Sequence, residues 1–298
     1  MAKLNLSERM IDPNSPERRP RRAAYALPTF FTAGNIFLGY ISVIQSFQAS
    51  MIASAGGVGA EPHFELAAKC IGFAVFLDGL DGRIARMTNT TSDFGREMDS
   101  LADVISFGIA PAILAFAWGV QFLDPSIDPG IREIVHRAGY FFAFMFLLCG
   151  SARLARFNVQ KNPIPKNPGR PDRKYFVGLA IPAGAGMIAS VVYASGSGPI
   201  RYWPIAVLWL ALQGVLSFLM VSTWRYYAFK GMNLRRPFSY LMVIGLGSLI
   251  YLIYYFSQTV LLALAITYVT SGILIRIGGV LRRHLRPTPP REPERQIG

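Results

Sequence analysis

Four aspartates in the first half of the chain have the residue type and spacing to do chemistry. Asp78 and Asp81 stand three positions apart, and Asp99 and Asp103 four positions apart. On helices, each spacing places its two carboxylates on one face. Both pairs border long apolar runs, where a carboxylate costs roughly 2.5–3.5 kcal/mol on insertion scales. This cost predicts a positive charge between the pairs, and divalent cations bound by oxygen ligands are the natural candidates.

The elements that must position these aspartates are membrane helices. The chain has 298 residues, of which 52% are hydrophobic and only 16% charged. This composition excludes an ordinary soluble domain and indicates an all-α polytopic membrane protein. We predict about eight transmembrane helices, at 29–50, 64–84, 98–121, 138–157, 176–196, 202–223, 237–256 and 258–281. They form one catalytic domain over 27–283, between disordered tails at 1–26 and 284–298.

The distribution of basic residues predicts the orientation in the membrane. With eight spans, all but four of the 30 lysines and arginines lie on the side that holds both termini. The positive-inside rule therefore places both termini in the cytosol, in an inner (cytoplasmic) membrane. The same asymmetry accounts for the net charge of +13 without a nucleic-acid partner. It also brings the four aspartates to the cytosolic ends of the second and third helices, so the active site is expected among the first four helices at that face.

Two divalent cations would balance the four aspartates in charge. Two-metal sites hold both ends of an in-line displacement at phosphorus. Gly82 has no side chain, so a ligand can approach its backbone closely. Arg86 follows one turn later and can offer its guanidinium to a diphosphate. Intramembrane aspartates also occur in the ion relays of transporters, and a cation-coupled transporter is the alternative function.

The whole segment resembles the signature of the CDP-alcohol phosphatidyltransferase family. It reads Asp78-x2-Asp81-Gly82-x2-Ala85-Arg86-x8-Gly95-x3-Asp99-x3-Asp103. The resemblance implies transfer of a phosphatidyl group from CDP-diacylglycerol to an alcohol, with release of CMP and with two Mg²⁺ or Mn²⁺ ions. It implies that the four aspartates bind metal and that Asp103 also accepts the proton. The residues it assigns to CDP-diacylglycerol are Asn35, Gly82, Arg86 and Ser92.

Three further segments resemble the branch of the family that uses L-serine. They are SFGIAPA from Ser106, RLARFN from Arg153 and YFVGLAIPAGAG from Tyr175. Serine carries a carboxylate, and we expect Arg153, Arg156 and Asn158 to bind it, although the two arginines could instead be positive-inside anchors. Glycerol 3-phosphate, inositol phosphate and choline remain alternative acceptors. The resemblance also implies a homodimer. The last helices carry no segment that resembles the family.

Overall fold

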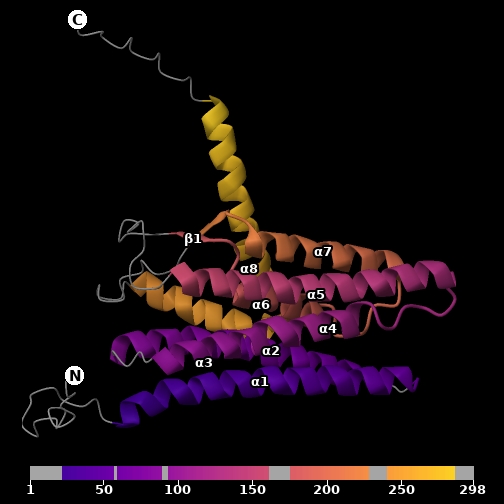
Figure 1. Cartoon of the computed structure of the whole chain (residues 1–298), viewed down its shortest axis with the longest axis horizontal. Coiled ribbons are helices and arrows are strands. Elements are labelled where there is room, and N and C mark those ends of the chain that lie inside the picture. The colour runs from indigo at the N-terminus through magenta and orange to yellow at the C-terminus, as the bar shows by residue number, and fades with distance from the viewer. Residues whose placement is uncertain (1–21, 57–58, 89–92, 161–174, 228–239, 286–298) are drawn as a thin grey trace, which may run out of the picture.

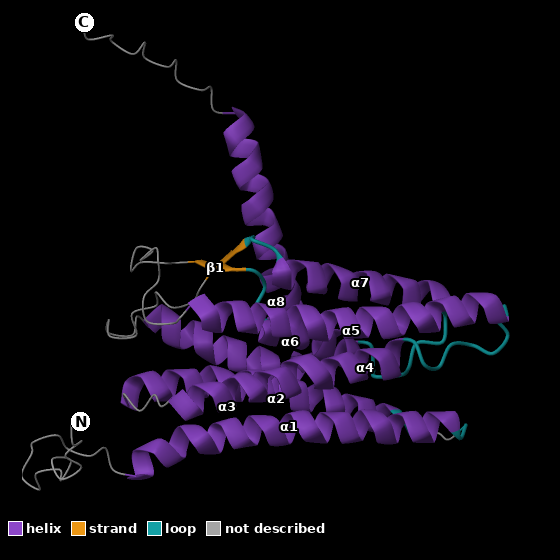
Figure 2. Cartoon of the chain, in the orientation of Figure 1, coloured by secondary structure: helices purple, strands orange, loops and turns teal. Residues whose placement is uncertain are grey.

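The computed structural model describes residues 22–56, 59–88, 93–160, 175–227 and 240–285. These residues form long helices that lie side by side, as Figure 1 shows. In chain order the elements are α1 (Arg22–Ser54), α2 (Glu61–Thr88), α3 (Asp93–Asp103), the π-helix η2 (Val104–Ile109), α4 (Ala110–Gly119), α5 (Pro129–Gln160), β1 (Tyr175–Val177), α6 (Ile181–Ala194), α7 (Trp203–Val221), β2 (Arg225–Tyr227) and α8 (Tyr240–Leu285). Figure 2 shows how completely helices dominate, so the predicted all-α class is confirmed.

Five helical stretches in the described part of the chain are long and apolar enough to cross a bilayer. They are Phe30–Ser54, Phe94–Gly119, Pro129–Val159, Trp203–Val221 and Tyr251–Gly278. A further apolar helix, α6, is shorter. The chain is therefore a polytopic membrane protein, and the count of eight spans stays a prediction.

The predicted helix at 98–121 is a composite of three consecutive elements. It begins at Asp93, passes from α3 into η2 after Asp103, and continues as α4. The N–H of Ala110 donates to the carbonyl of Ile105, five residues back. Pro111 follows in the first turn of α4 and has no N–H with which to bond the preceding turn. Short π segments of this kind occur often at functional sites, and this one directly follows a predicted metal ligand.

The prediction of a helix at 176–196 is wrong for its first residues. Residues Tyr175–Val177 form strand β1, which pairs antiparallel with β2 so that Phe176 lies opposite Tyr226. Gly178 then turns the chain with a φ of +77°, a conformation that glycine adopts without strain. Pro182 lies in the first turn of α6, where its missing N–H costs nothing. These two residues explain why the helix begins only at Ile181.

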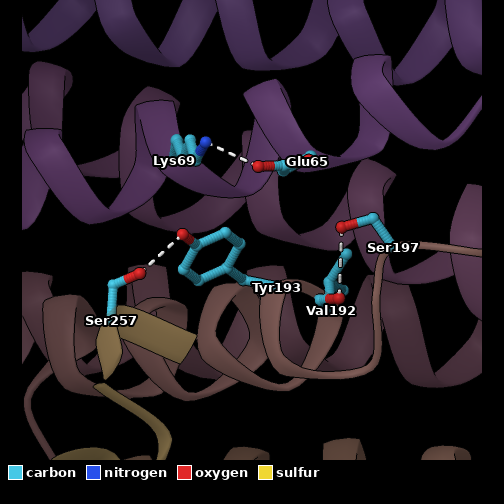
Figure 3. Close-up of polar contacts among 6 residues, drawn as sticks. All are labelled: Glu65, Lys69, Val192, Tyr193, Ser197 and Ser257. Carbon is cyan, nitrogen blue, oxygen red and sulfur yellow. Dashed lines mark hydrogen bonds and ion pairs between the residues drawn. The ribbon is translucent and has the colours of Figure 1, made fainter. Parts of the chain in front are cut away.

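The last helix, α8, changes direction at Phe256, whose φ and ψ of −130° and 38° are not helical. This break falls where the sequence predicts the boundary between two spans, 237–256 and 258–281. The next residue, Ser257, shares a hydrogen bond of 2.8 Å with the hydroxyl of Tyr193 on α6 (Figure 3). The C-terminal part of α8 then extends away from the other helices (Figure 1).

Candidate active site

The site begins with three aspartates from two neighbouring helices. Asp78 lies on α2, and Asp99 and Asp103 lie on α3. Each offers a carboxylate oxygen, and these oxygens all lie within 4.8 Å of one another. The three side chains are half-buried. The expectation that the two helices bring their carboxylates together is therefore met for these three, and such an arrangement suits a divalent cation.

Four of the predicted site residues are not placed in detail. Asp81, Gly82 and Arg86 belong to α2, but their side-chain surroundings lie outside the described residues, and Ser92 lies outside them altogether. Their roles in binding metal or CDP-diacylglycerol stay predictions.

Asn35 lies on α1, which packs against α2, α3 and η2. Its side chain is only 2% exposed. Among the described residues, its side-chain oxygen Oδ1 has no hydrogen-bond partner. A buried polar atom without a partner is unfavourable, because it has lost water and gained nothing. The role of Asn35 in binding CDP-diacylglycerol stays a prediction.

Arg153 supplies positive charge next to the acidic cluster. It lies on α5, and its guanidinium interacts electrostatically with the carboxylate of Asp103. Its Nε atom is buried and has no hydrogen-bond partner within the described part of the chain. An arginine that only anchored the helix at the membrane surface would direct its polar atoms to water. The buried Nε of Arg153 differs from that of such an anchor, and the binding of serine by Arg153 stays a prediction.

Arg156 has a different set of contacts, although it lies only one turn further along α5. Its Nη1 atom donates a hydrogen bond of 3.2 Å to the carbonyl of Val221, the last residue of α7. The final carbonyls of a helix have no partner within the helix, and a basic side chain near them is stabilising. The structure thus gives Arg156 a role at the end of α7, which the sequence did not indicate.

Asn158 connects α5 to α3. Its Nδ2 atom donates a hydrogen bond of 2.8 Å to the hydroxyl of Ser100. That hydroxyl also donates to the carbonyl of Arg96, 2.9 Å away. Ser100 follows directly after Asp99 in the chain, so Asn158 holds the helix that carries two of the three clustered aspartates. Sequence reasoning missed Ser100, because serines on helices are common and nothing in the motif marks it.

Comparison with known proteins identifies the family of this chain. The sequence model of the CDP-alcohol phosphatidyltransferase family matches residues 25–219. The chain therefore belongs to the CDP-alcohol phosphatidyltransferase family, and the aspartate cluster lies inside the matched region.

Several relatives carry a more specific name, CDP-diacylglycerol–serine O-phosphatidyltransferase. The protein of that name from Helicobacter pylori is 36% identical over 212 residues, which are 71% of this chain and 76% of the relative. The one from Saccharomyces cerevisiae is 36% identical over 171 residues, 57% of this chain and 55% of the relative. An archaetidylserine synthase from Methanothermobacter thermautotrophicus is 33% identical over 212 residues, 70% of this chain and 72% of the relative.

Proposed function

We propose that this protein transfers the phosphatidyl group of CDP-diacylglycerol to the hydroxyl of L-serine, giving phosphatidylserine and CMP. The observation that carries this proposal is the cluster of Asp78, Asp99 and Asp103, with ligand oxygens within 4.8 Å of one another. These aspartates belong to the family signature, and the relatives named above have serine in their names. The choice of serine as acceptor rests on these names and on the three branch segments.

The chemistry of the cluster fits two divalent cations, Mg²⁺ or Mn²⁺. Asp78, Asp81, Asp99 and Asp103 would hold them, since carboxylates are preferred ligands of both ions. Bound cations would neutralise the charge of the diphosphate and of the departing CMP. Among the described residues, the Oδ1 atom of Asn35 is buried and has no hydrogen-bond partner. It leaves an uncharged hydrogen-bond acceptor where α1 packs against its neighbours, which supports the same assignment. Asn35, Gly82, Arg86 and Ser92 would hold the CDP part of the lipid.

Asp103 has the best position to accept the proton of the serine hydroxyl. It is the carboxylate of the cluster that interacts with Arg153. An acceptor whose carboxylate is bound by Arg153 would therefore have its hydroxyl within reach of Asp103. Arg153 contributes binding and orientation, and Asp103 contributes general base catalysis.

The membrane arrangement follows from the same proposal. The end of the bundle that carries the aspartates would face the cytosol, where serine is dissolved, and both termini would lie on that side of the inner membrane. The acyl chains of CDP-diacylglycerol would enter between helices from the bilayer. The catalytic unit would be residues 27–283, and the family resemblance favours a homodimer.

A screen of acceptors tests the proposal directly. Purified protein would receive CDP-diacylglycerol and Mn²⁺ or Mg²⁺, and then serine, glycerol 3-phosphate, inositol phosphate or choline in turn, while CMP release is measured. We expect CMP release when serine is the acceptor and none with the other three compounds. Release with a different acceptor would assign the protein to another branch, and no release with any acceptor would favour the transporter alternative. Omitting the divalent cation is the control.

A further inference from the structure

One end of the helix bundle carries both the aspartate cluster and the end of α7. Arg156 of α5 donates a hydrogen bond to the carbonyl of Val221, the last residue of α7. Two positions further along α5, Asn158 donates to the hydroxyl of Ser100, which directly follows Asp99. The chain that leaves α7 therefore emerges at this end of the bundle, which we call the aspartate end.

Strand β2 follows α7 and holds α8 at the aspartate end. The hydroxyl of Tyr226 donates to the carbonyl of Val269, 3.5 Å away. A Cβ atom at Gly272 would collide with the ring of Tyr226, so only glycine permits this approach. The next residue, Ile273, still packs against the core. Helix α8 therefore reaches the aspartate end at Gly272 and Ile273.

The rest of α8 continues beyond this point as a C-terminal arm, residues 274–285. Residues 274–278, the part of the arm whose surroundings are described, are all exposed. They include Leu274, which is 66% exposed, and Ile277, which is 56% exposed. Figure 1 shows the yellow end of α8 extending away from the other helices. The described chain thus leaves large aliphatic side chains of the arm uncovered.

The sequence of the arm has an apolar face and a basic face. The apolar positions that share one face by helical spacing are Leu274, Ile277, Leu281 and Leu285. Arg276 and Arg283 stand seven positions apart and fall on the opposite face, and Arg282 falls at the boundary. The sequence of α8 contains no aspartate or glutamate that could pair with these arginines.

Neither water nor the hydrocarbon core of a bilayer suits such an arm. In water its aliphatic face would stay exposed, which the hydrophobic effect disfavours. In the hydrocarbon core its three arginines would lose their hydration and find no acidic partner in the helix. The membrane surface suits both faces, because aliphatic side chains enter the acyl boundary while basic side chains reach lipid phosphates. A second copy of the arm is a poorer partner, since two copies would bring like charges together.

We propose that the C-terminal arm lies in the membrane surface at the aspartate end, where its arginines bind the phosphates of anionic phospholipids. The predicted span at 258–281 would then end at Ile273. Attachment of this kind depends on lipid charge, and each basic residue near an anionic surface strengthens it about fivefold. The inference does not depend on the acceptor that the enzyme uses, because it concerns lipids bound outside the aspartate cluster.

A nitroxide label on the full-length protein tests the inference without measuring turnover. Ile277→Cys would carry the label, after alanine has replaced the buried Cys70 and Cys149. The protein would be placed in nanodiscs of phosphatidylcholine, with or without phosphatidylglycerol. Electron paramagnetic resonance would compare collisions of the label with oxygen, which enters the acyl region, and with a neutral nickel chelate, which stays in water. We expect oxygen collisions to dominate when phosphatidylglycerol is present and nickel collisions to dominate when it is absent.

Charge variants of the arm and a second label position are the controls. Arg276→Gln, Arg282→Gln and Arg283→Gln together should weaken attachment about a hundredfold and expose the label to nickel even beside phosphatidylglycerol. Lysine at the same three positions keeps the charge and should keep the arm attached. A label at Tyr202→Cys, next to the start of α7 and far from the aspartate end, should not respond to phosphatidylglycerol.

Each contrary result would overturn the inference. Oxygen collisions that dominate without phosphatidylglycerol as well would show an ordinary membrane-spanning segment. Nickel collisions that dominate in its presence would place the arm in water. Shielding of the label from both reagents would show that protein covers the arm, as a second copy would. Release of the arm by the lysine variant would show that charge does not hold it.

Discussion

The hydroxyl of Ser106 donates a hydrogen bond of 2.8 Å to the main-chain carbonyl of Asn35, which joins η2 to α1. The side chain of Ser106 is fully buried. Gly39 lies one turn after Asn35, and a Cβ atom there would lie 2.6 Å from the Ser106 hydroxyl and 2.8 Å from its Cα. Because η2 follows Asp103 directly, this contact joins α1 to the segment next to the aspartates of α3.

Gly39→Ala should therefore damage both stability and activity. The added methyl group meets the backbone of η2, which cannot move aside as a flexible side chain would, and overpacking of this kind costs about 1–3 kcal/mol. We expect a lower thermal midpoint in detergent and CMP release below a fifth of wild type.

Gly72→Ala provides the control for this substitution. Gly72 lies on α2, where an added Cβ atom would have nothing within 4 Å, and alanine favours a helix by about 1 kcal/mol over glycine. This variant should keep wild-type activity and be at least as stable as wild type. Equal behaviour of the two variants would show that the contact between Gly39 and Ser106 does not matter.

Asp78→Asn and Asp99→Asn should abolish turnover and weaken binding of divalent cations. Both carboxylates belong to the cluster within 4.8 Å, and an amide removes the charge while keeping the shape. Binding of Mn²⁺ would be followed by electron paramagnetic resonance, and CMP release would be measured in parallel. Removing divalent cations with a chelator should abolish CMP release by the wild-type protein, and adding the cation back should restore it.

Glu133→Gln is the matched control, since Glu133 is an exposed carboxylate that pairs with Arg137 on the surface of α5. Activity above a tenth of wild type in both aspartate variants would contradict the assignment of these residues as metal ligands.

Asp103→Asn should slow the chemical step more than it weakens binding of the lipid substrate. A proton acceptor matters chiefly in the transition state, and its loss usually costs at least ~100-fold in rate. Binding of CDP-diacylglycerol would be measured directly, and turnover of the bound complex by a single-turnover assay. A variant that loses binding while its bound fraction reacts at the normal rate would mark Asp103 as a metal ligand only.

The parts of the site that the sequence predicts are those where spacing alone determines geometry. Residues four positions apart on a helix lie on one face. This spacing predicts that Asp99 and Asp103 lie together, and in the structure they do. The helical class follows equally directly, because long apolar runs have no other stable form in a bilayer.

The parts that the sequence did not predict depend on contacts between distant segments. The hydroxyl of Tyr226 donates to the carbonyl of Val269, and its ring lies against Gly272, across more than forty residues of chain. The strand at Tyr175–Val177 forms only because its partner, β2, lies beside it, and a window of apolar residues cannot distinguish that pairing from the first turn of a helix. The different contacts of Arg153 and Arg156 likewise depend on where α7 ends.

Arg153→Lys should raise the KM for serine about tenfold, while Arg156→Lys should leave it unchanged. Lysine keeps the charge but loses the paired N–H donors that match a carboxylate. The charge of Arg153 acts on the carboxylate of Asp103, whereas Arg156 donates to the carbonyl of Val221. Arg156→Lys should instead lower the thermal midpoint slightly, because the end of α7 loses a hydrogen bond. Equal serine KM values for wild type and both variants would place serine recognition elsewhere.

We expect Asn158→Ala to lower kcat without changing the KM for serine, because the Nδ2 atom of Asn158 is bound to α3. Its Nδ2 atom donates to Ser100, next to Asp99, across 2.8 Å. Loss of one neutral hydrogen bond costs ~1 kcal/mol of stability, so the variant should also have a lower thermal midpoint. Ser100→Ala removes the other partner of the same bond, so the double variant should be no worse than the more damaged single variant. If Asn158→Ala raises the serine KM and the effects of the two substitutions add, Asn158 binds the acceptor and the contact with Ser100 is incidental.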